Sequence, residues 1–316
     1  MRALKYSDIG LISRNISTLD SRDEADTSVE FAGQKLTVPL IAAPMPDVCD
    51  GTMAGHLLRL GAYGFIHRFN TIEEQANEYK LADCDCGCAI GINGDCFERF
   101  QELAFAGCRS FCLDVANGAN TRVKATLEKL MSLYSDVYFT VGNVASKECY
   151  EWLCDLNIYA IRCGIAGGSS CTTRVETGLF YPMASSVLEC ASVKSKTMLI
   201  ADGSIKEPRD ICKALVLGAD ICMAGCIFAG TEESPSKTLR LDGQLMKIYK
   251  GAASFSTQKQ VNKKPKYVEG METLIPYTGP LEKIIHRFRN GLRSSMSYMN
   301  SRTIAEYQKK SDWTII

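Results

Sequence analysis

One cysteine in a glycine-rich segment is the strongest candidate for chemistry in this sequence. Residues 164–174 read GIAGGSSCTTR and follow a short apolar run. Glycines lack a Cβ, so their backbone N–H groups can approach a phosphate closely. A cysteine beside such a turn can attack an electrophilic carbon of the same ligand. The segment therefore predicts phosphate binding together with covalent chemistry at Cys171.

The other cysteines favour a different interpretation. The chain has 15 cysteines, an odd number, and no apolar export signal at its start, so we expect mostly reduced thiols. An arbitrary cysteine here is best explained as a small buried hydrophobe, but the glycines and threonines around Cys171 favour a nucleophile. Cys84, Cys86 and Cys88 resemble a metal motif, yet their spacing does not match the usual zinc patterns. We therefore disfavour a metal site there.

Composition excludes several classes of function. The chain has 316 residues, of which 46% are hydrophobic and 23% charged, enough for a large core. Lys plus Arg equals Asp plus Glu at 36 each, which argues against a nucleic acid polymer as partner. The sequence contains no apolar stretch long enough to span a membrane. We expect a cytoplasmic protein without membrane contact.

Short apolar runs alternate with helical patterns along most of the chain. The expected strands are residues 39–44, 63–68, 88–93, 110–116, 137–144, 160–165, 198–203 and 221–229. Short apolar runs of this kind are typical of parallel strands that are buried on both faces. Eight strand–helix units predict a single (β/α)8 barrel domain over residues 1–316, an α/β fold also called a TIM barrel.

Three segments lie outside this alternation. Residues 28–31 and 35–38 alternate around a short turn and predict an N-terminal hairpin. Residues 252–279 are mostly polar and predict a mobile active-site flap. Pro280 then begins a helix whose apolar residues share one face.

The strand ends define the candidate site, because active sites in such barrels lie at the carboxyl ends of the strands. Asp202 follows the seventh strand, and a carboxylate can accept hydrogen bonds from two adjacent ribose hydroxyls. Two alternatives remain open: Asp202 as a simple turn former, and His67 with Arg68 as strand caps. The strand-end residues are Met45, His67, Arg68, Asp114, Asn117, Gly118, Gly142, Asn143, Asp202, Gly203, Gly225 and Cys226.

A series of short motifs extends over nearly the whole chain. They are residues 6–9 (YSDI), 21–22, 26–27, 43–45 (APM), 113–118 (LDVANG), 142–144, 170–174 (SCTTR), 201–203 (ADG), 229–235 (AGTEESP), 251–254, 268–270 and 292–298. In these motifs and their order the sequence resembles the IMP dehydrogenase and GMP reductase family. The resemblance implies a purine nucleotide substrate, a nicotinamide cofactor and a homotetramer.

The resemblance also implies roles for individual residues. Cys171 is expected to attack C2 of the purine, with Thr173 and Glu269 assisting proton transfer. Thr173 as a helix N-cap and Glu269 as a solvated flap charge remain open alternatives. The residues expected to bind the nucleotide are Met45, Gly167, Gly168, Ser169, Asp202, Gly203, Gly225, Cys226, Tyr249, Gly251, Ala252, Ala253 and Ser254. Those expected near the cofactor are His67, Arg68, Asp114, Ala116, Asn117, Gly118 and Asn143. A monovalent cation such as K⁺ is expected on the backbone carbonyls of Ala166, Gly168 and Cys171.

Three features favour the reductase, which converts GMP to IMP with NADPH. Residues 113–118 are similar to the reductase form of that motif. The chain has no CBS-type regulatory insertion between the second and third strands. No Arg-Tyr pair, which the dehydrogenase uses to activate water, occurs in residues 251–279. An NAD-dependent IMP dehydrogenase and a nucleotide-binding homologue without activity remain the alternatives.

Four positions depart from the family pattern. Ala166-Gly167 replaces the usual Gly-Pro, which predicts a looser loop and argues against a tightly held cation. Ser204 replaces a glycine, and Cys226 replaces a residue that is commonly Ser or Gly. Because these positions surround the expected phosphate and ribose, a variant substrate such as dGMP remains open.

Overall fold

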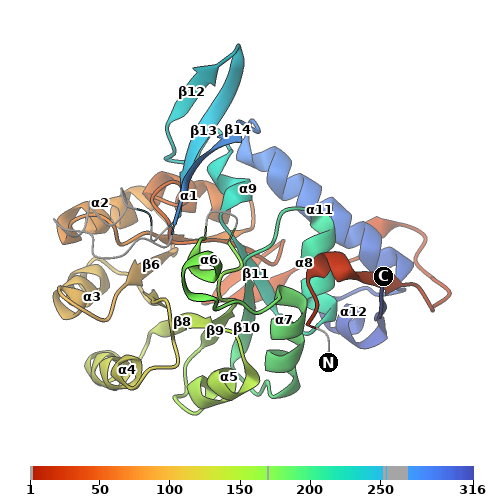
Figure 1. Ribbon diagram of the computed structural model, residues 1–316, viewed down its shortest axis with the longest axis horizontal. Helices are drawn as coiled ribbons and strands as arrows, with labels where there is room; N and C mark the ends of the chain where they lie inside the picture. Colours follow the sequence, from red (N-terminus) through yellow and green to blue (C-terminus); the bar gives the residue numbers. More distant parts are fainter. Residues whose placement is uncertain (1–2, 169–170, 252–253, 255–269) are drawn as a thin grey trace.

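The barrel predicted from the sequence is present. The computed structural model describes residues 3–168, 171–251, 254 and 270–316. Eight parallel strands close into a barrel in chain order, with β11 returning to pair with β4 (Figure 1). The strands are β4 (Leu40–Ala42), β5 (Tyr63–Ile66), β6 (Gly87–Ile90), β7 (Ser110–Asp114), β8 (Tyr138–Val144), β9 (Ala160–Cys163), β10 (Met198–Asp202) and β11 (Ile221–Ala224).

Helices follow the strands and surround the barrel (Figure 1). They are α1 (Gly51–Arg59), α2 (Ile72–Ala82), α3 (Cys96–Phe105), α4 (Thr121–Leu133), α5 (Lys147–Cys154), α7 (Met183–Ser192) and α8 (Pro208–Val216). Several begin at side chains that accept a backbone N–H, as Asp50 does for α1 and Ser146 for α5. Thr71 and Glu74 form a reciprocal capping box at the start of α2.

The eighth strand is shorter than predicted. It ends at Ala224, and Cys226–Ala229 forms the short helix α9 instead of strand. The chain turns at Gly225, where a Cβ would lie 2.6 Å from the Tyr249 hydroxyl. Because the apolar run continues through both elements, hydrophobicity alone could not separate them.

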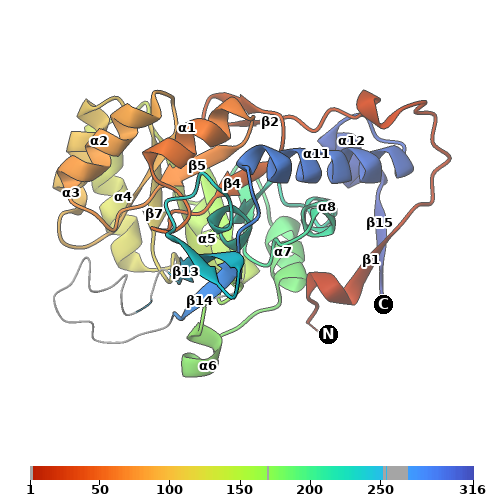
Figure 2. The same cartoon turned by 90° about the horizontal axis from the view of Figure 1, so that it is seen from above.

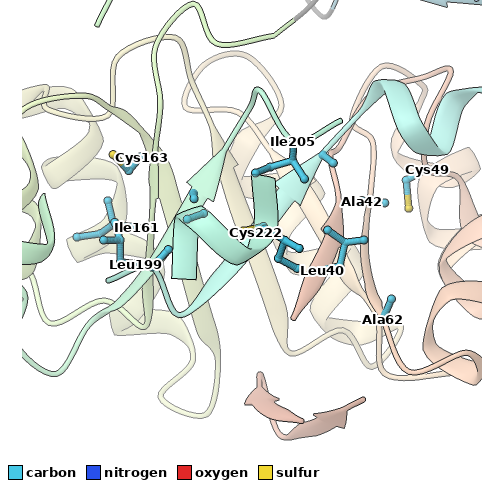
Figure 3. Close-up of a cluster of buried hydrophobic side chains, with 14 of the residues drawn as sticks. Leu40, Ala42, Cys49, Ala62, Ile161, Cys163, Leu199, Ile205 and Cys222 are labelled. Carbon is cyan, nitrogen blue, oxygen red and sulfur yellow. The ribbon is translucent and has the colours of Figure 1, made fainter. Parts of the chain in front are cut away.

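Alternate residues of each strand face two different apolar layers. Leu40 and Ala42 of β4 pack toward the helices, whereas Ile41 faces the barrel interior. The outer layer includes Ile161 and Leu199 on neighbouring strands, and Figure 3 shows part of it. This continuous outer layer holds the helices in place around the strands, and thereby positions the strand ends.

The N-terminal hairpin closes one end of the barrel. It consists of β2 (Val29–Phe31) and β3 (Gln34–Leu36). Phe31 is fully buried, with its ring centroid 5.0 Å from that of Tyr63 and 5.5 Å from that of Tyr159. The hairpin prediction is confirmed, and the hairpin completes the inner core at the amino ends of the strands.

A small antiparallel sheet was not predicted from the sequence. It contains β12 (Thr238–Leu241), β13 (Gln244–Lys250) and β14 (Glu272–Pro276), and extends away from the barrel (Figure 1). Strand β14 therefore occupies the end of the segment predicted as a flap. Residues 252–253 and 255–269 of that segment lie outside the described residues.

The remaining elements tie the two chain ends to the barrel. Their bounds are η1 (Tyr6–Asp8), β1 (Ile9–Ile12), η2 (Arg22–Glu24), α11 (Leu281–Tyr298), α12 (Ile304–Lys310) and β15 (Asp312–Ile315). Strand β1 pairs antiparallel with β15, and Figure 2 shows these two strands side by side. The apolar face expected on the helix after Pro280 is confirmed: Leu281, Ile285, Phe288, Leu292 and Met296 of α11 are buried. Among the described helices, none has the length and hydropathy needed to cross a bilayer.

Candidate active site

A cavity of about 440 Å³ lies at the carboxyl ends of the barrel strands. Its walls combine strand-end loops, the segment around Cys171 and the start of the segment after β13. The lining residues are Ala43, Pro44, Met45, Arg68, Phe69, Asp114, Val115, Ala116, Asn143, Arg162, Gly164, Ile165, Ala166, Gly167, Gly168, Cys171, Thr173, Asp202, Gly203, Gly225, Tyr249 and Gly251. The cavity thus brings together most of the described residues that the sequence analysis singled out.

Cys171 lies in the wall of this cavity, directly before the short helix α6 (Thr173–Thr177). Its thiol is half-buried and donates a hydrogen bond to Thr173 Oγ1, with 3.2 Å between sulfur and oxygen. The N-cap of α6 is Thr172, so the interpretation of Thr173 as the N-cap is wrong. The Thr173 hydroxyl is instead placed beside the cysteine.

The segment after β13 returns to the cysteine. Gly270 forms β-bridges with Cys171 and with Ser254. The Ser254 N–H also donates to the Gly251 carbonyl at 2.9 Å, and Ser254 is fully buried. The expected residues Ser169, Ala252, Ala253 and Glu269 lie outside the described part of the chain.

Close backbone contacts hold the glycine loop in place. At Gly164, with φ of +142°, a Cβ would lie 2.1 Å from the Asp202 carbonyl oxygen. Ser204 donates two hydrogen bonds to the Gly167 carbonyl, from its backbone N–H at 3.1 Å and its hydroxyl at 3.0 Å. The loop is therefore held tightly where the sequence predicted looseness, because Ser204 supplies a hydroxyl that glycine lacks.

Two departures from the family pattern share a backbone conformation. Ala166 has φ of +58° and Ser204 has φ of +57°, both in the left-handed region that glycine adopts most easily. A left-handed alanine costs roughly 1–2 kcal/mol. The Gly168 carbonyl, one of the expected cation ligands, accepts the Cys171 N–H at 3.3 Å. A cation at that carbonyl would have to share it with this hydrogen bond.

A buried arginine that the sequence analysis missed joins two of the predicted residues. Arg162 lies on β9 and donates to Asp114 Oδ1 at 2.8 Å and to Asp202 Oδ2 at 2.9–3.0 Å. Asn143 donates to the same Asp202 oxygen at 2.7 Å. At Gly142 a Cβ would lie 2.4 Å from the Arg162 Cβ, so the neighbouring strand needs glycine to admit this side chain.

These contacts determine which groups are charged. Burial alone raises the pKa of Asp114, but the Arg162 and Arg68 guanidinium groups outweigh it and hold that pKa below its usual value. Burial favours the neutral form of Arg162, yet Asp202 and Asp114 raise its pKa well above the ordinary range. The cavity floor therefore carries a fixed carboxylate–guanidinium–carboxylate arrangement.

Asp202 keeps one oxygen for a ligand. The contacts from Arg162 and Asn143 go to Oδ2. Within the described residues, Oδ1 of Asp202 takes part in no hydrogen bond or ion pair. This oxygen can accept a hydrogen bond from a hydroxyl group of a molecule in the cavity.

Strand β13 supplies the opposite wall. Tyr249 is buried, and its hydroxyl lies 3.8 Å from the Met45 sulfur. The Lys250 N–H donates to Asp47 Oδ2 at 2.9 Å, which ties β13 to the loop after β4. Burial raises the pKa of Asp47 despite this contact and the nearby Lys250 ammonium.

Six predicted residues that the structure describes do not line the cavity: His67, Asn117, Gly118, Gly142, Cys226 and Ser254. His67 is 8% exposed, and its Nδ1 accepts the Phe69 N–H at 3.1 Å. Asn117 accepts the Ala119 N–H in a local turn, and the Gly118 N–H donates to the Asn143 carbonyl. Through these contacts, His67, Asn117 and Gly118 support the loops that form the cavity wall.

The signal for Arg162 was present in the sequence. It is a charged residue inside the apolar run 160–165, and a buried charge requires a partner.

In the described residues, no group of three or more His, Cys, Asp or Glu side chains is arranged to hold a metal ion.

The fold and the cavity at the strand ends are those of a barrel enzyme. Comparison with known proteins identifies its family. A family model described as IMP dehydrogenase / GMP reductase domain matches residues 3–316. This chain therefore belongs to the IMP dehydrogenase and GMP reductase family, and its relatives are oxidoreductases.

Both branches of the family occur among the similar proteins. A GMP reductase of Chromobacterium violaceum is 33% identical over 310 residues, covering 96% of this chain and 95% of that protein. An inosine-5′-monophosphate dehydrogenase of Borreliella burgdorferi is 28% identical over 380 residues, covering 99% and 94%. A GMP reductase of Lactobacillus delbrueckii subsp. bulgaricus is 32% identical over 323 residues, covering 100% and 96%.

Proposed function

We propose that this protein is an NADPH-dependent reductase that converts GMP, or a close analogue such as dGMP, to IMP and ammonia. The observation that carries the proposal is the Cys171–Thr173 hydrogen bond in the wall of a cavity that also contains Asp202. A nucleophile, a hydroxyl that can move a proton and a carboxylate for the sugar are the groups this reaction requires.

The first step forms a covalent intermediate. The Cys171 sulfur attacks C2 of the purine, the C2–N bond of the amino group breaks, and ammonia leaves with the thiol proton. The product is a thioimidate between Cys171 and C2. Thr173 Oγ1, 3.2 Å from the sulfur, is placed to receive the proton and pass it to the leaving nitrogen. We propose Glu269 as its partner, because the next residue, Gly270, bridges Cys171.

The second step reduces C2. NADPH, when bound, supplies the hydride for this carbon. The Cys171 sulfur then leaves as the purine double bond reforms, which releases IMP. The cavity wall near Asp114 fits the nicotinamide group, because Val115 and Ala116 offer small apolar contacts while Arg68 and Asp114 offer polar ones.

The choice of reductase over dehydrogenase depends on water activation. The dehydrogenase branch hydrolyses its intermediate with an Arg-Tyr pair, and residues 251–279 contain no arginine. Lys266-Tyr267 is the nearest substitute in this sequence. Without that pair, release of ammonia and transfer of hydride to C2 are favoured over hydrolysis of the intermediate.

One assay separates the candidate functions. The protein is mixed with GMP and NADPH, and separately with IMP and NAD, while nicotinamide absorbance and ammonia are measured. Oxidation of NADPH with stoichiometric ammonia supports the proposal. Reduction of NAD by IMP would identify a dehydrogenase instead, and nucleotide binding with neither reaction would identify an inactive homologue.

A variant pair then tests the nucleophile. Cys171→Ala should abolish turnover and leave GMP binding within a few fold, because the sulfur is needed only for the covalent step. Cys149→Ala is the matched control: Cys149 is also partly exposed but lies on α5, outside the cavity lining. Near-normal turnover in Cys171→Ala contradicts the mechanism.

The sugar of the nucleotide substrate can be ribose or deoxyribose. We propose that Asp202 Oδ1 accepts one sugar hydroxyl, since Oδ2 is committed to Arg162 and Asn143. Comparing kcat/KM for GMP and dGMP measures how much the 2′-hydroxyl contributes. A strong GMP preference would exclude the deoxynucleotide as the substrate.

Four further properties complete the proposal. We propose a homotetramer in the cytoplasm, a flap over residues 252–279, and a K⁺ site on the carbonyls of Ala166, Gly168 and Cys171. Sedimentation measures the assembly. Replacing K⁺ by Na⁺ in the assay buffer tests the cation, with reduced turnover as the expected result.

A further inference from the structure

Two cysteines lie close together at the end of the barrel opposite the cavity. Cys84 and Cys86 occupy the loop between α2 and β6, at the amino end of that strand. The Cys86 N–H donates to the Cys84 carbonyl at 2.9 Å, which closes a tight turn between them. Cys84 is partly exposed, whereas Cys86 is 2% exposed. The turn therefore presents one accessible thiol beside a buried one.

The surroundings make the two thiols unequal. Interaction with the Cys86 thiol lowers the pKa of Cys84, and the Arg59 guanidinium acts in the same direction, against burial and the Asp85 carboxylate. The same interaction and burial raise the pKa of Cys86. Thiolate character is thus concentrated on the accessible sulfur, which is the pattern of a nucleophile with a resolving partner.

We infer that Cys84 and Cys86 form a reversible redox modification site, which takes up small disulfides of the glutathione class. The Cys84 thiolate attacks one sulfur of the disulfide and releases one thiolate, leaving a mixed disulfide on Cys84. The Cys86 thiol, on losing its proton to that released thiolate, attacks the Cys84 sulfur and expels the second small thiolate. Two cysteine thiols are oxidised to one disulfide, and the small disulfide is reduced to two thiols.

A second cavity gives the resolving sulfur space. It has a volume of about 200 Å³ and is lined by Cys86, Asp85, Gln34 and Arg109, among other residues. A tightly packed thiol could move only by displacing core atoms. Because this space adjoins Cys86, its side chain can change rotamer without displacing core atoms.

A buried cysteine pair provides an internal control. The sulfurs of Cys163 and Cys190 lie 3.4 Å apart, but both residues are fully buried. An S–S bond is about 2.05 Å long, so a disulfide here would need the two sulfurs to approach by about 1.4 Å. It lacks access to an oxidant, so comparing the two pairs separates access from proximity.

The test is a thiol map of the full-length protein carrying Cys171→Ala, which removes the proposed active-site nucleophile. The protein is incubated with glutathione disulfide, remaining thiols are blocked with iodoacetamide, and peptides are identified by mass spectrometry. We expect the loss of alkylation at Cys84 and Cys86 together, its recovery with dithiothreitol, and unchanged Cys163 and Cys190. Full alkylation of Cys84 after incubation, or oxidation of Cys163 and Cys190 first, overturns the inference.

Two serine variants test the order of attack. Cys86→Ser should stop the reaction at a glutathione adduct on Cys84, because the resolving thiol is missing. Cys84→Ser should leave Cys86 unmodified, because the accessible nucleophile is missing. Modification of Cys86 in Cys84→Ser, or a persistent glutathione adduct on Cys84 when both cysteines are present, contradicts the proposed roles. Circular dichroism of each variant verifies that the protein is folded.

Discussion

The two ends of this barrel are built from the same eight strands but have opposite chemistry. At the amino end, Phe31 of the hairpin packs its ring against Tyr63 and Tyr159 and closes the interior. At the carboxyl end, Arg162 and Asp202 are nearly buried yet border an open cavity. The strands serve as a common scaffold, and the residues at each end decide whether it is closed by apolar packing or opened for a ligand.

The difference shows where the protein tolerates costly interactions. Rings at the amino end need only contact area, and pack in edge-to-face geometry. A buried guanidinium at the other end must be satisfied by carboxylates from two other strands, and Gly142 must lack a side chain. The amino end is therefore stabilised by apolar packing, whereas the stability of the carboxyl end depends on a network of charges.

The largest expected effect follows from breaking that network. Arg162→Met should reduce the free energy of unfolding by about 3–5 kcal/mol, because it removes the cation shared by two buried carboxylates and leaves only Arg68 beside Asp114. Nucleotide binding should fall as well, since Asp202 loses the contact that orients it. Urea unfolding and GMP titration measure the two effects.

A conservative variant sharpens this prediction. Arg162→Lys keeps a positive charge but reaches only one carboxylate at a time, so its loss of stability should lie between wild type and Arg162→Met. A loss below about 1 kcal/mol in Arg162→Met would mean that the two carboxylates are stabilised without the guanidinium.

The matching change at the closed end concerns Phe31. Phe31→Ala should cost about 3–4 kcal/mol, because it opens a void against Tyr63 and Tyr159. KM for the nucleotide should stay unchanged, since the hairpin does not line the active-site cavity.

The control for Phe31 is Phe105, which is 86% exposed on α3. Phe105→Ala should change stability by less than about 0.5 kcal/mol. Thermal or urea unfolding of both variants gives the comparison. A clear rise in KM for Phe31→Ala would show that the two ends are coupled, contrary to the division proposed here.

The pH dependence of stability probes buried polar groups behind the cavity wall. Burial, aided by Arg99, lowers the pKa of His67 to about 4. The unfolded state, with an ordinary pKa near 6.5, binds the proton more readily than the folded state. His67 therefore contributes stability above about pH 6.5, and this contribution, about 3 kcal/mol, is lost as the pH falls toward 4.

Comparison with His67→Asn isolates this effect, because asparagine can still accept the Phe69 N–H. The wild-type curve alone is insufficient: burial, followed by the charge of Asp50, raises the pKa of Glu78 to about 7, and this group favours the folded state as pH falls. The stability difference between wild type and His67→Asn should shrink between pH 7 and pH 4. A constant difference would contradict the buried neutral imidazole.

The two ends of the barrel also differ in how much of their structure could be predicted from the sequence. The strands, the hairpin and the Cys171 loop each carry a local pattern, and all were predicted. Arg162 was missed because its partners, Asp114 and Asp202, are 48 and 40 residues away in the sequence. Contacts between distant strand ends leave no periodic signal. The sheet β12–β14 was missed for a related reason: strands β12 and β14 are largely exposed, so apolar burial gives them no clear pattern.

The smallest expected effect concerns the backbone of the cavity loop. Ala166 adopts φ of +58°, so Ala166→Gly should relieve its steric cost and stabilise the protein by up to about 1 kcal/mol. Gly167→Ala is the opposite change, since a Cβ there would lie 3.0 Å from the Met183 sulfur and should destabilise the loop. Thermal unfolding measures both variants, and a loss of stability in Ala166→Gly would contradict the strain. If kcat also rises in Ala166→Gly, the strain opposes catalysis; if kcat falls, the strained alanine helps to hold Cys171 in place.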